Sequence, residues 1–111
     1  MNAENGKVVA KLPIGDRVDG VAFDPEKKRA YSSNGEGTMT VVQQSKGDKY
    51  SVLTTVSTNE GARTIACDSQ THHLYLPYAE YGPAPAPTAT NPHPRPTVKP
   101  GTFMVIDIAP N

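Results

Sequence analysis

The sequence predicts an all-β chain built from antiparallel four-stranded sheets. Its apolar segments are short, rich in Val, Ile, Thr and Tyr, and bounded by Gly, Pro, Asn or Asp, which is typical of antiparallel strands. No segment combines a helical period with helix-capping residues. A repeat indicates how the strands are ordered, because the stretch VAFDPEKKRAYSS (21–33) returns as IACDSQTHHLYLP (65–77).

The strands follow in chain order, separated by sequences that suit tight turns. They are expected over 7–12, 18–23, 28–33, 38–43, 50–56, 62–67, 73–78 and 102–108. Two of the strand pairs are joined by the polar turns DPEKK and DSQTH. The leading Asp of each turn can accept hydrogen bonds from the backbone that follows it. SNGEG and SKGDK contain the Gly residues that turns between strands require. Asp24 and Asp68 are therefore interpreted as turn formers and not as paired catalytic carboxylates.

The repeat extends over nearly the whole chain. A shift of 44 residues aligns KVVAKL (7–12) with SVLTTV (51–56) as well as the two stretches above. GTMTVVQ (37–43) returns as GTFMVID (101–107) once the Pro-rich insertion 82–100 is skipped. Four strands per repeat of about 40 to 45 residues is the pattern of a β-propeller blade. We expect a single propeller-like unit over 1–111, with blade-like repeats over 6–49 and 50–108.

The strand order predicts assembly. Labelled a to d from the hub of a propeller outward, the strands run d, a, b, c, d, a, b, c. Closed propellers have about four to eight blades, so two blades cannot form a ring. The chain is expected to be part of a larger ring, either in a longer protein or by association of about three or four copies, and a dimer joined edge to edge is the alternative. Unpaired edges favour pairing by strand addition.

A known family carries a similar repeat. GKVVAKLPIG and VAFDPEKKRAYSSNGEGTMTVV resemble the repeat of the YVTN-type β-propeller family, and the segment from Leu76 to Pro110 is similar to the carboxyl end of larger bacterial members. Residues 31–34, Tyr-Ser-Ser-Asn, depart from the Y-V-x-N of the usual repeat. The resemblance implies a propeller fold and a periplasmic or extracellular location for full-length relatives. Some propellers resembling this family are lactonases or carry haem domains, and some members carry a DNA-binding label.

The predicted core consists of inner-strand side chains, and Phe23→Ala is expected to cost about 3 to 5 kcal/mol. The core positions are Val21, Phe23, Tyr31, Val41, Ile65, Cys67, Tyr75, Phe103 and Val105.

A candidate binding site follows from the loops. The d-to-a and b-to-c connections are expected on one rim, which also receives Asp16 and Glu60. Arg63 is interpreted first as the partner of a structural salt bridge, and the alternative is that it binds a carboxylate or phosphate of a small anionic ligand or peptide. The insertion 82–100 is interpreted as an inert surface loop. The alternatives are a lid over the rim and a ligand for an aromatic-lined groove on another protein. The candidate ligand-binding residues are Arg17, Asp19, Arg63, Glu80, Tyr81, His93 and Arg95.

Composition narrows the function classes. Eleven Lys and Arg balance eleven Asp and Glu, which makes nucleic acid an unfavoured partner. No apolar run is long enough to span a membrane, and no signal peptide is visible. Cys67 is the only cysteine, and it occupies the repeat position of Phe23, which favours a small buried apolar side chain over a nucleophile. His72 and His73 are interpreted as solvated turn residues. No metal site, cofactor site or catalytic constellation is predicted.

The favoured function is a binding or assembly scaffold that acts within a larger ring or a homo-oligomer. A ligand-binding or lactonase-like propeller enzyme using the loop rim is the first alternative, and nucleic-acid binding is the second.

Overall fold

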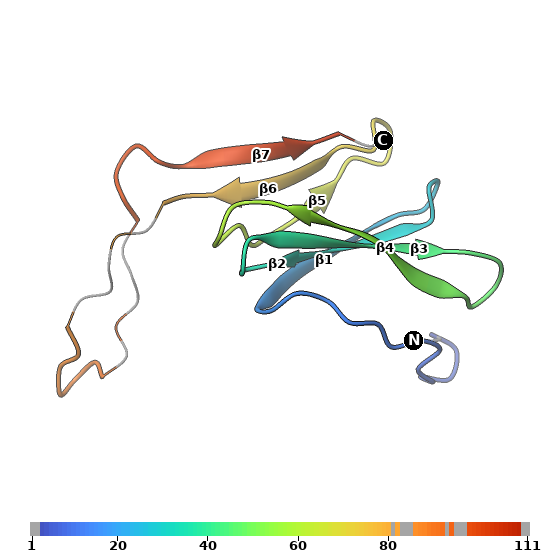
Figure 1. Cartoon of the computed structure of the whole chain (residues 1–111), viewed down its shortest axis with the longest axis horizontal. Coiled ribbons are helices and arrows are strands. Elements are labelled where there is room, and N and C mark those ends of the chain that lie inside the picture. Colours follow the sequence, from blue (N-terminus) through green and yellow to red (C-terminus); the bar gives the residue numbers. More distant parts are fainter. Residues whose placement is uncertain (1–2, 81, 83–85, 93, 95–97, 110–111) are drawn as a thin grey trace.

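Two antiparallel sheets lie one over the other in the computed structural model, which describes residues 3–80, 82, 86–92, 94 and 98–109 (Figure 1). The described residues contain no helix. Sheet 1 has the order β1 (Val18–Asp24), β2 (Arg29–Asn34), β3 (Thr38–Gln44) and β4 (Tyr50–Ser57). Sheet 2 has the order β5 (Ala66–Cys67), β6 (Leu74–Tyr78) and β7 (Met104–Ile108). The all-β, antiparallel prediction is confirmed.

The two charged turns have the same local structure. The Asp24 carboxylate accepts two backbone N–H groups of the β1–β2 turn, and the Asp68 carboxylate does the same in the β5–β6 turn. Lys28, with φ of 54°, and His72, with φ of 65°, occupy the same position in the two turns. The interpretation of both Asp residues as turn formers is confirmed.

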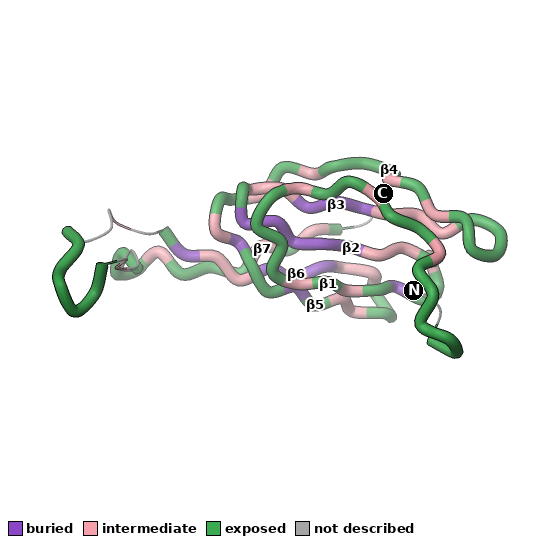
Figure 2. The backbone as a smooth tube through the Cα atoms, turned by 90° about the horizontal axis from the view of Figure 1, so that it is seen from below, coloured by how far each residue is buried: buried purple, intermediate pink, exposed green. Residues whose placement is uncertain are grey.

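The core lies between the two layers, and the buried residues gather in β2 and β3 of sheet 1 and in β6 of sheet 2 (Figure 2). Sheet 1 contributes side chains from β2 and β3, and sheet 2 contributes side chains from β6 and from the segment before β5. Since side chains alternate along a strand, only one face of each sheet enters this layer. The buried members are Tyr31, Met39, Val41, Ala62, Ile65, Leu74 and Leu76.

Four of the predicted core residues are exposed, and those assignments are wrong for the single chain. Val21 is 76% exposed, Phe23 50%, Phe103 70% and Val105 54%. They lie on the faces of the two sheets that point away from the shared core. The predicted cost of Phe23→Ala is wrong for the same reason, because a half-exposed ring loses less on truncation. Tyr31, Val41 and Ile65 are buried as predicted, and Cys67 is partly buried against the core. The core assignment of Tyr75 is wrong, because its partly buried side chain lies on the outer face of sheet 2.

The predicted first strand, 7–12, belongs to neither sheet. It runs along the outer face of sheet 1, where Val9 and Leu12 lie beside Val42 and Tyr50. A strand needs a neighbour to accept its backbone hydrogen bonds, and in the part of the chain that the structure describes no strand pairs with this segment. The predicted strand 62–67 is also too long, since β5 covers two residues only.

Candidate functional site

Three loops of the predicted rim meet at the end of sheet 1 where β2 ends. The Gly35 amide donates to the Arg17 carbonyl oxygen at 2.8 Å, and the Gly61 amide donates to the Gly35 carbonyl oxygen at 3.0 Å. The Arg17 guanidinium lies 3.6 Å from the Glu60 carboxylate, and both side chains are mostly exposed. Water and salt screen such a pair, so it contributes at most about 1 kcal/mol.

The described candidate residues of the rim are exposed. Arg17, Asp19, Arg63 and Glu80 all present their side chains to solvent. The Arg63 backbone is held in place because its carbonyl oxygen accepts a hydrogen bond from the Ser33 hydroxyl.

Glu80 begins the long connection between β6 and β7. Its amide donates to Thr102 Oγ1 at 3.0 Å, and its carbonyl oxygen accepts the Lys99 amide at 2.7 Å, so the two ends of the connection are tied together. The other three candidate residues, Tyr81, His93 and Arg95, lie outside the described residues.

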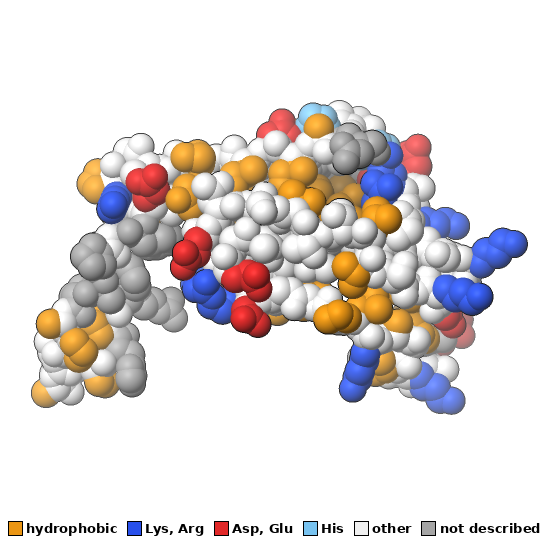
Figure 3. All heavy atoms as spheres, in the orientation of Figure 1, with side chains coloured by type: hydrophobic (Ala, Val, Ile, Leu, Met, Phe, Trp, Pro, Cys, Tyr) orange, Lys and Arg blue, Asp and Glu red, His pale blue; other side chains and the backbone are white. Residues whose placement is uncertain are grey.

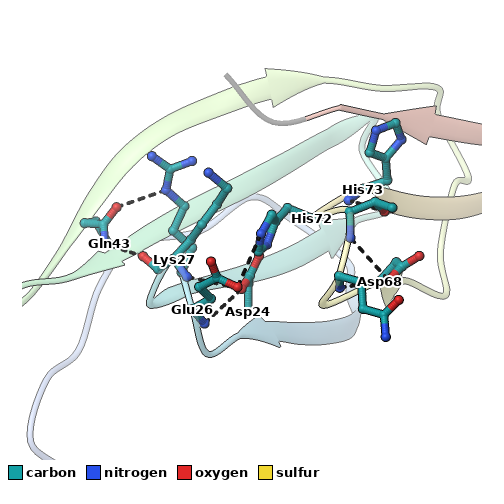
Figure 4. Close-up of polar contacts among 10 residues, drawn as sticks. Asp24, Glu26, Lys27, Gln43, Asp68, His72 and His73 are labelled. Carbon is teal, nitrogen blue, oxygen red and sulfur yellow. Dashed lines mark hydrogen bonds and ion pairs between the residues drawn. The ribbon is translucent and has the colours of Figure 1, made fainter.

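A buried polar contact joins the two sheets at the opposite end of the molecule (Figure 4). Asp24 is fully buried, and its Oδ2 lies 2.5 Å from His72 Nδ1. Nε2 of the same imidazole lies 3.6 Å from the Glu26 carboxylate. His72 is only 17% exposed, so its interpretation as a solvated turn residue is wrong. The cause is the stacking of the sheets, which places the β5–β6 turn against the β1–β2 turn.

The surroundings of Asp24 favour its charged form. Burial works to raise the pKa of this carboxyl, but hydrogen bonds from the Lys27 amide, His72 and the Glu26 amide outweigh burial, so its pKa lies below the ordinary value. Asp24 therefore remains a carboxylate that holds both a turn and an inter-sheet contact.

The neighbouring histidine has a partner on β7. His73 Nδ1 lies 2.7 Å from Asp107 Oδ1, and both side chains are partly exposed. Through this exposed contact, His73 ties the β5–β6 turn to β7.

Cys67 is the one cysteine of the sequence. Burial raises the pKa of its thiol, and the nearby Asp24 and Asp68 carboxylates raise it further. A thiol in these surroundings is a poor nucleophile, because the thiolate is the reactive form. Within the described part of the chain, no three His, Cys, Asp or Glu side chains are grouped so that they could hold a metal ion.

The outer face of sheet 1 is apolar only in part. Ser32 and Thr40 share the face of Val21, and both are buried because the segment at Gly15 lies over them. Val21 and Phe23 on β1 are exposed there. In the register of the sheet, Phe23 is opposite Ala30, which in turn is opposite Val42, so these three side chains share one face.

The outer face of sheet 2 also carries apolar side chains. Val105 on β7 is opposite Pro77, and Ala66 on β5 is opposite Tyr75. Phe103, directly before β7, is the next residue of this face and is mostly exposed. The molecule therefore has a hydrophobic layer inside and apolar residues on both outer surfaces.

The two outer faces match the two inner faces in the sequence repeat. The shift of 44 relates exposed Val21 and Phe23 of sheet 1 to Ile65 and Cys67, which face the core from sheet 2. It was not predicted from the sequence that equivalent positions would be exposed in sheet 1 and buried in sheet 2, although the shift of 44 already aligned them.

The same relation holds in the other direction. The alignment of GTMTVVQ with GTFMVID relates Met39 and Val41, which are buried on the inner face of sheet 1, to Phe103 and Val105, which are exposed on the outer face of sheet 2. Each outer face thus carries residues equivalent to one side of the contact that already exists inside the chain.

An open cleft lies between the sheets on the side of β4. Its volume is 340 Å³. Figure 3 shows hydrophobic side chains in a row between the two layers. The walls come from both sheets, and the residues that line the cleft are Arg29, Tyr31, Met39, Val41, Leu53, Thr54, Val56, His72, Leu74, Ile108 and Ala109.

The fold and these surfaces define an all-β protein of two stacked antiparallel sheets with apolar residues on both outer faces. No protein-family model, curated protein or solved structure matches the chain. The described residues include no helix of the length and hydrophobicity needed to cross a membrane.

Proposed function

We propose that this chain is an assembly module, in which copies stack head to tail and continue the two-layer packing of the chain in the manner of β-propeller blades. The observation that carries the proposal is the equivalence of the exposed outer faces to the buried inner faces. The outer face of sheet 2 in one copy packs on the outer face of sheet 1 in the next copy. Val105 and Phe103 then take the place that Val41 and Met39 occupy inside the chain.

The exposure of these side chains supports association. Soluble monomers rarely expose large contiguous apolar patches, and such patches commonly mark interaction sites. Terminal units of stacked repeat proteins normally carry polar outer faces, whereas both outer faces here carry Val and Phe side chains. The driving force for burial is about 25 cal/mol per Å² of apolar surface, which favours contact between the two faces.

Net charge does not oppose this association. The positive and negative side chains balance, so copies carry no formal net charge that would keep them apart. We prefer assembly over a ligand site on the loop rim, because the described rim residues are exposed and Arg17 already faces Glu60.

The first test measures association by sedimentation velocity and light scattering. The parent chain is expected to form multimers in a concentration-dependent way. Val21→Glu and Phe103→Glu each place a carboxylate in an apolar contact and are expected to weaken association at least tenfold, since a buried unpaired charge is costly. Ser45→Glu, in the exposed β3–β4 turn, is the matched control and is expected to leave association unchanged.

A mixture of the two variants distinguishes head-to-tail stacking from a symmetric dimer. Val21→Glu leaves the face of sheet 2 intact, and Phe103→Glu leaves the face of sheet 1 intact. Equal amounts of the two are therefore expected to form one-to-one pairs that neither variant forms alone. A parent chain that stays monomeric at high concentration, or a mixture that does not pair, would contradict the proposal.

A further inference from the structure

Among the described residues, sheet 2 has no counterpart of one strand of sheet 1. In sheet 1, β4 pairs with β3 and completes four strands, whereas sheet 2 ends at β7. Leu53, Thr54 and Val56 of β4 line the 340 Å³ cleft together with Ile108 of β7. The free edge of β7 and the uncovered side chains of β4 thus border the same space, which has the position of a missing strand.

We infer that the segment 7–12 of a second copy occupies this cleft and pairs with β7 as the fourth strand of sheet 2. The inference rests on the proposed head-to-tail assembly and names the segment that completes it. The repeat identifies this segment, because KVVAKL (7–12) aligns with SVLTTV (51–56), most of β4. The same type of segment therefore completes both sheets, once within a chain and once between chains.

The register of sheet 1 indicates how the added strand pairs. In sheet 1, Gln43 is opposite Ser51 and Val42 is opposite Val52. The repeat relates the first pair to Asp107 and Lys7, and the second pair to Ile106 and Val8.

These equivalent pairs have complementary side chains. Lys7 of one copy comes opposite Asp107 of the other, which joins opposite charges, and both residues are exposed in the single chain. Val8 comes opposite Ile106, and residues directly opposite each other in an antiparallel sheet share a face. Since Ile106 packs against the core, Val8 would point into the cleft beside it.

A chain's own segment does not lie in its own cleft. Val9, Ala10 and Leu12 lie beside Val42 and Tyr50 on the outer face of sheet 1, whereas the cleft lies on the inner face of that sheet. Figure 1 shows the amino-terminal segment below sheet 1 and sheet 2 above it. In a stack, sheet 2 of the neighbouring copy packs on this same outer face, so the segment already lies on the side where its partner sheet arrives.

Disulfide trapping between full-length copies tests the pairing. In a Cys67→Ala background, one tagged chain carries Val8→Cys and one untagged chain carries Ile106→Cys. Mixing them under mild oxidation is expected to give a tagged–untagged covalent dimer. The matched control replaces Ile106→Cys by Ser45→Cys, at an exposed turn, and is expected to cross-link at least tenfold more slowly. Lys7→Cys with Asp107→Cys provides a second pair, which keeps the core side chains and removes only the exposed contact of Asp107 with His73.

Light scattering on the same mixtures separates the two proposals. Covalent dimers with either designed pair, together with multimers, support the strand addition. Multimers without a cross-link in both pairs overturn the strand addition and leave the stacking function standing. Monomers overturn both, and a cross-link formed within one chain carrying Val8→Cys and Ile106→Cys, in place of a link between chains, also overturns the strand addition.

Discussion

Leu76→Ala is expected to lower the free energy of unfolding of the single chain by about 3 kcal/mol. Leu76 lies on β6 with none of its surface exposed, between the two sheets. Truncation removes buried methyl groups and leaves a cavity that the strands on either side cannot easily fill. For a small domain with a modest core this is a large part of the total stability. Urea unfolding followed by circular dichroism, at a concentration where the chain is monomeric, measures the loss.

Phe23→Ala is the matched comparison for that prediction. The ring is half exposed on the outer face of sheet 1, so the monomer is expected to lose about 1 kcal/mol or less. At concentrations where copies stack, the same change is expected to cost more, because the ring then lies in an interface. Equal losses for Leu76→Ala and Phe23→Ala in the monomer would show that the face assignment of β1 is wrong.

Asp24→Ala is expected to cost about 3 kcal/mol as well, through a different cause. The change removes the acceptor of two turn amides and leaves His72, which is mostly buried, without its carboxylate partner. Asp68→Ala is the matched control, since Asp68 accepts the same two turn hydrogen bonds but has a more exposed environment. We expect a clearly smaller loss for Asp68→Ala. Similar losses for both variants would mean that the contact with His72 adds nothing to the turn.

The contribution of Asp24 also depends on pH. The pKa of this carboxyl is lower in the folded chain than its ordinary value, which is about 3.9 in the unfolded chain. A depressed pKa stabilises the fold above the unfolded value and loses that effect as the pH falls through the folded value. The stability difference between the parent chain and Asp24→Asn is therefore expected to shrink below about pH 4. Urea midpoints of both chains at pH 6 and pH 3 measure this stability difference. A larger difference at pH 3 than at pH 6 would contradict the lowered pKa of Asp24.

Local pattern was sufficient to predict the strands but not the faces they bury. Turn residues and β-branched runs bounded β1 to β4 to within a residue or two, because both signals act over neighbouring residues. Side chains alternate along a strand, so Val21 and Phe23 lie on one face of β1 and Ala22 and Asp24 lie on the other. When both faces carry apolar side chains, this alternation does not determine which face packs against the second sheet. Segment 7–12 was predicted as a strand because its residue pattern is typical of one, but pairing also requires a neighbouring strand, which the local pattern does not reveal.

The contact between Asp24 and His72 depends on tertiary structure that the sequence pattern does not contain. The two residues are 48 positions apart, and they meet only because the sheets stack with their charged turns aligned. One signal was present. His72 occupies the turn position of Lys28, so a repeat that stacks its units in register would bring this histidine to the turn of the first unit. The rim residues depend in the same way on long loops, whose conformation short-range pattern does not determine.

The long connection between β6 and β7 has a consequence for the order in which the chain folds. The turns of sheet 1 are short, so each of its hairpins closes a small loop, whereas β7 must find β6 across about 25 residues, which costs on the order of 1 to 2 kcal/mol more in closure entropy. Sheet 1 is therefore expected to form the folding nucleus, and β7 to join late. In pulsed hydrogen exchange, the β2 and β3 amides should be protected before those of β7. Until β7 joins, the inner face of sheet 1 is partly uncovered, so a nascent chain is most exposed to aggregation during that interval.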